Sequence, residues 1–132
     1  MKSLDTLIRL KRFQAEEKRR HLAQIETMIA EFERMSRDLE REIAAEEQRS
    51  GITDMQHFAY STYARAAVTR RDNMRRSADE LKDQLREARL AHEDAMSEVG
   101  KVEALGERER IEAPVDMSPR NVAGRARAAL GA

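Results

Sequence analysis

Apolar residues recur over the first fifty positions with the alternating spacing of four and three that is typical of a coiled coil. The series begins at Leu4 and ends at Ile43, and nine of its twelve members are apolar. A seam of this length predicts one continuous helix from about residue 3 to about residue 49. The members are Leu4, Ile8, Lys11, Ala15, Lys18, Leu22, Ile25, Ile29, Phe32, Ser36, Leu39 and Ile43.

A second series with the same spacing begins at Tyr60. It is mostly apolar, and five of its members are alanines. This series predicts a second helix from about residue 54 to about residue 112. The members are Tyr60, Ala64, Ala67, Arg71, Met74, Ala78, Leu81, Leu85, Ala88, His92, Ala95, Val99 and Val102.

A turn at residues 50–53 is expected between the two helices. Gly51 suits the left-handed position that follows a helix end. Thr53, with Gln56 three residues later, has the spacing of a capping box for the next helix. A turn this short joins antiparallel neighbours. The sequence therefore predicts an all-α fold: an antiparallel two-helix coiled-coil hairpin over residues 1–112, followed by a disordered, flexible tail over residues 113–132.

Charge favours the same arrangement. Residues 1–20 carry seven basic and three acidic side chains, whereas residues 77–100 carry three basic and seven acidic ones. If the turn lies at 50–53, facing seam residues have numbers that sum to about 103, and Ile8 faces Ala95. Arg71 then faces Phe32. The second helix has no partner beyond about residue 100, so its end is expected to project alone.

The composition argues against an enzyme or a metal protein. Charged residues make up 38% of the 132 residues and aromatic residues only 4%, and there is no cysteine. His21, His57 and His92 are too scattered to form a metal site of common spacing. A two-helix rod offers no concave pocket for catalysis. We expect no cofactor, no metal and no membrane-spanning segment, and the N-terminus does not resemble a secretory signal.

Two sets of residues suggest partner binding. The first helix starts with a basic set, Arg9, Lys11 and Arg12. It is interpreted as a tip that docks on an acidic protein surface, as a solvated face balanced by the neighbouring helix, or as a basic region that reads DNA. The second set follows the turn, and there a two-helix rod cannot bury every apolar side chain. Its members are Met55, Phe58, Tyr60 and Tyr63. The alternatives for this set are a local fold-back around the turn and contact between copies of the chain in an oligomer.

Three stretches resemble the FliJ family of flagellar type III export proteins, in the form found in alphaproteobacteria. They are MKSLDTLIRLKRFQAEEKRR, QIETMIAEFERMSRDLEREI and GITDMQHFAYSTYARAAVTRRDN, within about residues 1–105. The resemblance implies a cytoplasmic, non-enzymatic coiled-coil stalk for flagellum biogenesis and motility, peripherally associated with the inner-membrane export apparatus. Its partners would be the export ATPase ring, the cytoplasmic domain of the export gate and export chaperones. Arg9, Lys11 and Arg12 would enter the ring.

Two other functions stay open from the residues. One is a generic coiled-coil adaptor or chaperone. A prefoldin-like hairpin would need strands at the turn, and SGITDMQ leaves no room for them. The other is a nucleic-acid binder, which would need a dimer presenting two basic arms. The complementary charge blocks favour an intramolecular hairpin instead, so nucleic acid is not an expected partner.

Overall fold

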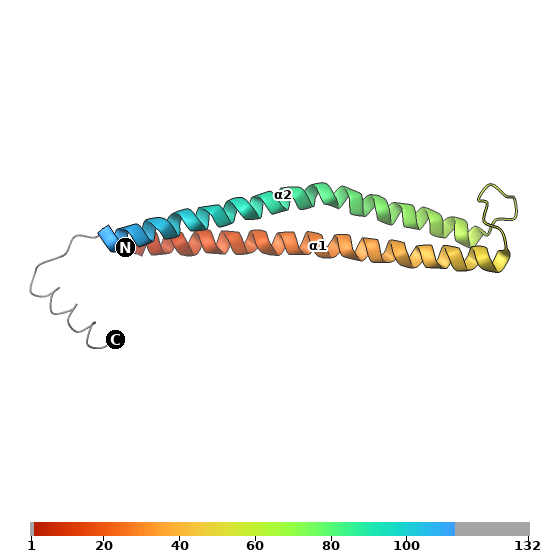
Figure 1. The fold of residues 1–132 in the computed structure, drawn as a ribbon, viewed down its shortest axis with the longest axis horizontal. Coiled ribbons are helices and arrows are strands. Elements are labelled where there is room, and N and C mark those ends of the chain that lie inside the picture. Colours follow the sequence, from red (N-terminus) through yellow and green to blue (C-terminus); the bar gives the residue numbers. More distant parts are fainter. Residues whose placement is uncertain (1, 113–132) are drawn as a thin grey trace, which may run out of the picture.

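A computed structural model describes residues 2–112 as two long helices that run antiparallel. Helix α1 spans Lys2–Ser50 and helix α2 spans Thr62–Glu112. They lie side by side along almost their whole length, with the start of α1 beside the end of α2 (Figure 1). The all-α antiparallel hairpin is thus confirmed. The predicted flexible tail, residues 113–132, lies outside the described residues.

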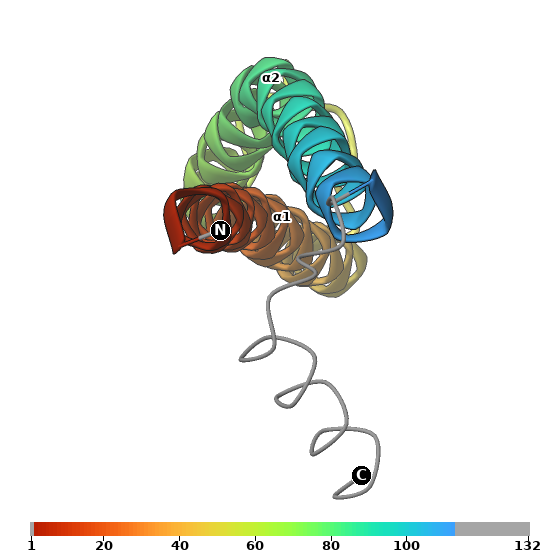
Figure 2. The same cartoon turned by 90° about the vertical axis from the view of Figure 1, so that its left-hand side faces the viewer.

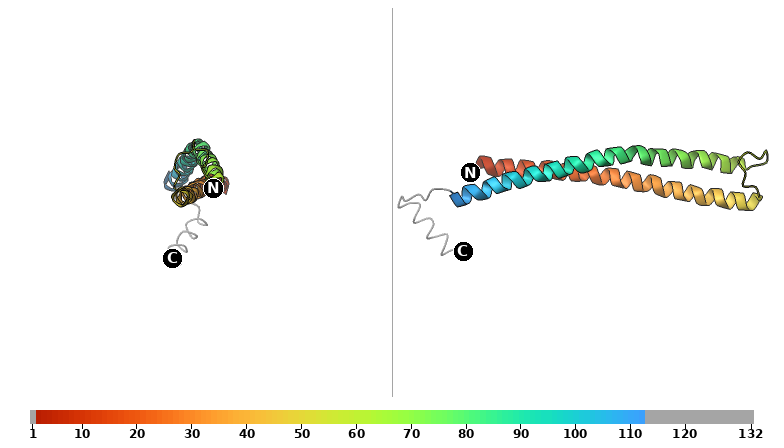
Figure 3. Two further views of the ribbon diagram at one scale, coloured as in Figure 1. Left: turned by 90° about the vertical axis from the view of Figure 1, so that its right-hand side faces the viewer. Right: turned by 45° about the horizontal axis from the view of Figure 1, so that its top comes forward.

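The two helices cross at a small angle rather than running straight alongside each other. Figure 2 looks along the rod, and Figure 3 shows it tilted, and in both views α2 bows and passes over α1. This wrapping keeps a seam with a 3.5-residue repeat facing the partner, because a straight α-helix has 3.6 residues per turn. At 1.5 Å per residue, the 49 residues of α1 make a rod about 74 Å long.

The seam residues form the core. Every member of the second series is buried or half-buried, and in the first series only Lys18 is exposed. One cluster joins Ile25 and Ile29 to Leu81 and Ala88. A second, nearer the turn, joins Ile43, Ala67 and Val68, although Val68 lies outside the predicted seam. Alanines on α2 therefore receive larger side chains from α1, which allows the helices to approach closely.

The register between the helices differs from the predicted one. Ile8 lies beside Gly106, and Arg12 pairs with Glu103. The numbers of these facing residues sum to about 114 rather than 103, a slip of about three helical turns. The predicted pairing of Ile8 with Ala95 is therefore wrong. The end of α2 beyond residue 100 does not project alone either, because Val102 is buried against α1.

The longer connection explains the slip. Gly51 adopts the expected left-handed conformation, with φ 75°, and its N–H donates to the Glu47 carbonyl. However, Thr53 does not begin a helix. The Gln56 N–H donates to the Asp54 carboxylate, and residues 51–61 form a non-helical connection with turns at 55–56 and 58–59. The predicted turn at 50–53 and the Thr53 capping box are thus wrong. Because the Asp54 side chain bonds a nearby backbone N–H, it competes with helix formation, and α2 begins only at Thr62.

Helix α2 begins where a serine caps it. The Ser61 hydroxyl accepts a hydrogen bond from the Ala64 N–H at 3.2 Å, and the Ser61 carbonyl accepts one from the Arg65 N–H at 3.0 Å. A hydroxyl at this position satisfies a backbone N–H that has no partner within the helix. The same Ser61 hydroxyl donates to Glu46 of α1 at 3.0 Å. The cap therefore also ties the start of α2 to the end of α1.

Candidate interaction surfaces

Among the described residues, the ion pairs between the two helices all lie on one side of the hairpin. We call it the paired side. Arg12 Nε lies 3.0 Å from Glu103 Oε1, and Lys82 Nζ lies 3.9 Å from Glu33 Oε1. Nearer the turn, Glu40 Oε1 pairs with the guanidinium groups of Arg71, at 3.1 Å, and Arg75, at 2.5 Å. Such exposed pairs contribute little stability individually, but together they disfavour other registers. Arg71 therefore meets Glu40, not Phe32 as the predicted register required.

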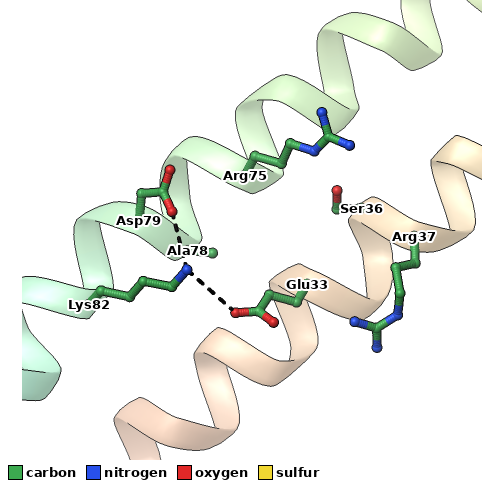
Figure 4. A pocket seen from close by; sticks show the side chains of 7 residues that line it. All are labelled: Glu33, Ser36, Arg37, Arg75, Ala78, Asp79 and Lys82. Carbon is green, nitrogen blue, oxygen red and sulfur yellow. Dashed lines mark hydrogen bonds and ion pairs between the residues drawn. The ribbon is translucent and has the colours of Figure 1, made fainter.

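Two shallow hollows open on the paired side. The first, about 300 Å³, has Ser36 and Ala78 at the seam and charged side chains around them (Figure 4). Lys82 lies between Asp79 and Glu33 there. The second, near the open end of the rod, is lined in part by Ala15, His92, Met96 and Val99. Both exist because small seam residues leave room between long flanking side chains.

The first hollow is lined mainly by charged side chains, most of which are in ion pairs. Around Ser36, Lys82 pairs with Glu33 and Asp79, and Arg75 pairs with Glu40, whereas Arg37 has no ion-pair partner among the described residues. Within residues 2–112 no three His, Cys, Asp or Glu side chains are grouped so that they could hold a metal ion. His57 is in the connection, where its Nδ1 accepts the Ala59 N–H. The hollows are better understood as consequences of helix packing.

Of the four predicted binding residues at the turn end, two are exposed and two pack against the rod. Phe58 is 95% exposed and stacks on His57, with ring centroids 4.8 Å apart. Tyr63 is also exposed, and its hydroxyl donates to Glu42 at 3.1 Å. Tyr60 is instead buried. Met55 packs against the second core cluster, so the predicted stripe shared by Met55 and Phe58 is wrong. Met55, Phe58 and Tyr60 lie in the connection before α2, where helical spacing does not apply.

The surroundings of Tyr60 hold the connection against the rod. Its hydroxyl donates to the Glu47 carboxylate at 2.9 Å, and the Arg65 guanidinium lies 5.4 Å from the centre of its ring. Burial raises the pKa of Tyr60, and the hydrogen bond to Glu47 raises it further. For Tyr63, the hydrogen bond to Glu42 is the main cause of a raised pKa. Both phenols are therefore kept neutral beside a carboxylate.

The open end places the basic set of α1 in three different environments. Arg9 is exposed and has no ion-pair partner among the described residues. Lys11 is half-buried in the seam, as its position predicts. Arg12 is exposed and committed to Glu103. Of the three side chains, only Arg9 is thus both exposed and unpaired, so the set is less uniform than the sequence indicates.

Three apolar residues at this end were not identified from the sequence pattern. Leu7 is 36% exposed, Leu10 48% and Phe13 58%. The available signal was their position, since all three are large apolar residues outside the four-three series. Leu7 and Leu10 flank Arg9 in the sequence and Phe13 follows Arg12, and exposed apolar groups of this kind mark interaction sites. The open end therefore combines apolar and basic character.

Farther along α1, one carboxylate, that of Glu16, is paired with two arginines of the same helix. Glu16 accepts hydrogen bonds from Arg19, at 2.6 and 2.9 Å, and lies 3.5 Å from Arg20. The hydrogen bond from Arg19 lowers the pKa of Glu16 to about 2. Two of the arginines in the basic start of the chain are thus occupied by their own helix. This reduces the positive charge that α1 can offer to a phosphate backbone.

Comparisons with protein-family models, with curated proteins and with solved structures each found no match. Neither of the two described helices has an apolar stretch long enough to cross a membrane. The function is therefore inferred from the geometry of the rod and from the different side chains at its two ends.

Proposed function

We propose that this protein is a non-enzymatic coiled-coil stalk and escort component of the flagellar type III export apparatus. It would link the export ATPase ring to the membrane export gate and to export chaperones. The observation that carries the proposal is a rod about 74 Å long whose two helix ends meet at one tip. The resemblance of three sequence stretches to the FliJ family supports the same assignment.

The open end is the proposed contact with the ATPase ring. Its tip is narrow, since it consists of two adjacent helix ends, and it carries the exposed side chains of Leu7, Leu10 and Arg9. A tip of this kind suits insertion into a ring whose inner surface has acidic and apolar patches. The turn end is the proposed contact with the gate or with chaperones, because Phe58 presents almost its entire ring to solvent.

The second candidate is a generic coiled-coil adaptor that binds another protein through its turn end. The exposure of Phe58 favours this function equally, since it does not depend on export. The nucleic-acid alternative has less support. Arg12 is paired with Glu103 and Arg19 with Glu16, so much of the basic start is neutralised within the hairpin. Binding to phosphates would have to break these pairs.

The test is stimulation of the purified export ATPase by the wild-type chain and by Arg9→Glu/Lys11→Glu/Arg12→Glu. We expect the triple variant to keep its helicity by circular dichroism and to lose most of the stimulation. The matched control reverses three exposed arginines of the rod body and should stimulate normally. These are Arg34, Arg70 and Arg76. Equal stimulation by all three proteins would contradict insertion by the basic tip.

A pull-down from flagellated cells separates the two candidate functions. Recovery of the export ATPase with the wild-type chain, and its loss with the triple variant, would support the stalk. Recovery of a partner that depends on Phe58 but not on the open end, with no ATPase present, would support the adaptor.

A further inference from the structure

The side of the hairpin opposite the paired side has a different composition. Tyr63 of α2 and Glu42 of α1 meet there through a hydrogen bond of 3.1 Å. Stepping back from Glu42 by seven residues at a time keeps to one line along a coiled-coil helix. The line consists of Met35, Met28, His21, Gln14 and Leu7. None of these five side chains is an acidic or permanently basic group.

The facing line on α2 is almost as poor in charge. It continues from Tyr63 in the same steps, and beyond Arg70 it contains Ser77, Gln84, Ala91, Glu98 and Leu105. Glu98 is its one charged member, and Lys101 of the same helix lies 3.5 Å from it. We call these two lines, from Leu7 to Met35 and from Ser77 to Leu105, the neutral strip. It runs for about 42 Å.

The neutral strip is accessible. Leu7, Met28 and Met35 are 36%, 43% and 38% exposed, and Leu105 is 48% exposed. In a chain in which 38% of residues are charged, an uncharged face of this length is not expected from a solvated rod. The paired side shows the contrast, since charged residues occupy the corresponding positions there. Charge depletion with methionine enrichment is typical of the centre of a protein interface.

Carboxylates border the strip on both edges. The next line outward carries six carboxylates, Glu17, Glu31 and Asp38 on α1 and Glu80, Glu87 and Asp94 on α2. Its other members beside the strip are Leu10, Gln24 and Lys101. All six carboxylates are exposed. Of these six carboxylates, only Asp38 has an ion-pair partner among the described residues. That partner is Arg41, at 2.6 Å. A second copy of this chain docked on the strip would bring its own acidic edges against these, and like charges facing each other disfavour that pairing.

We propose that the neutral strip binds a helix of a partner protein that has an uncharged inner face and Lys or Arg along both edges. Such a helix lies along the groove between α1 and α2 and completes a three-helix arrangement. Its inner face covers Met28 and Met35, and its basic edges meet the two rows of carboxylates. The inference is independent of the export function, because it rests on the side of the rod and not on either end.

The test uses two synthetic helical peptides of four heptads, with the same Leu and Ala inner face and with either Lys or Glu along both edges. Fluorescence anisotropy measures the binding of each peptide to the full chain. We expect the Lys-edged peptide to bind at least about tenfold more tightly than the Glu-edged one. Met28→Glu should weaken that binding by at least about tenfold, because a charge would be buried at the centre of the strip.

The matched control is Met96→Glu, which introduces the same charge at a methionine 51% exposed on the paired side. This variant should bind within about twofold of wild type, and circular dichroism should show intact helix in both variants. Equal binding of the two peptides, or equal weakening by the two substitutions, would overturn the proposal.

A photo-crosslinker at position 28 identifies the occupant directly. Crosslinks to the added Lys-edged peptide support the proposal. Crosslinks that instead join two copies of the chain, or that join position 28 to residues 113–132, overturn it.

Discussion

Truncation of two aromatic residues in the connection, Phe58 and Tyr60, should lower the free energy of unfolding by very different amounts. Phe58 is 95% exposed, so Phe58→Ala removes little buried area and should change the free energy of unfolding by less than about 0.5 kcal/mol. Tyr60 is 5% exposed and joins the turn to the rod, so Tyr60→Ala should cost about 3–5 kcal/mol. Domains of this kind have total stabilities of about 5–15 kcal/mol, and the second loss is therefore a large fraction of the whole.

A third variant, Tyr60→Phe, separates the ring from its hydroxyl. It removes the 2.9 Å hydrogen bond to Glu47 and should cost about 0.5–1.5 kcal/mol near neutral pH. Because burial raises the pKa of Tyr60 in the folded state, the neutral phenol stabilises the fold. That contribution is complete below the pKa of the unfolded chain, about 10, and is lost as the pH rises through the folded value. Tyr60→Phe should therefore lose less stability above about pH 10 than wild type.

The assay is urea denaturation followed by circular dichroism, first near neutral pH and then at alkaline pH. Equal slopes of the transitions would show that the variants unfold as wild type does, so that the midpoints can be compared. A loss above about 2 kcal/mol for Phe58→Ala would place its ring in a core contact. A loss below about 1 kcal/mol for Tyr60→Ala would refute the argument that this ring anchors the connection.

Three further predictions concern the open end and the chemistry of the rod. Gly106→Ala should stabilise less than Gly100→Ala, itself worth up to about 1 kcal/mol, because a methyl at 106 meets Ile8 Cδ1 at 3.1 Å whereas position 100 has open space. In an Ile8→Val background, which lacks that atom, the difference should shrink in urea denaturation, and an unchanged difference would contradict the register. NMR titration should show a pKa of about 2 for the Glu16 carboxyl. Arg19→Gln should raise that value, and no change would exclude their hydrogen bond as its cause. A chelator should leave helicity and melting unchanged, and a cooperative loss of helix would reveal a bound metal.

The two helices and the faces that they bury could be predicted from the amino-acid sequence. The four-three spacing is a local property of each helix, because it depends only on the number of residues per turn. Hence every residue of the second series is at least half-buried, and even the polar Ser36 lies in the core where its position in the seam predicts. The end of α1 was equally local, since Gly51 provides a left-handed conformation there.

The candidate sites were predicted less well. Phe58 and Arg9 are exposed as expected, and Tyr60 is buried as its place in the seam predicts. However, Met55 faces inward and Arg12 is paired. The reason is that the residues after Gly51 do not continue as a helix, so counting along a helix does not show which way their side chains point. Both the hydrogen bond from Tyr60 to Glu47 and the packing of Met55 depend on a connection that returns to the rod.

The register between the two helices became evident only when they were seen packed together. A slip of eleven residues equals slightly more than three turns of helix, so it presents nearly the same seam to the partner, and spacing alone favours neither alignment. What selects between the alignments is the length of the connection, which ends at the Ser61 cap. Contacts that form only between the assembled helices, such as Arg12 with Glu103 and Ile8 with Gly106, then fit that alignment.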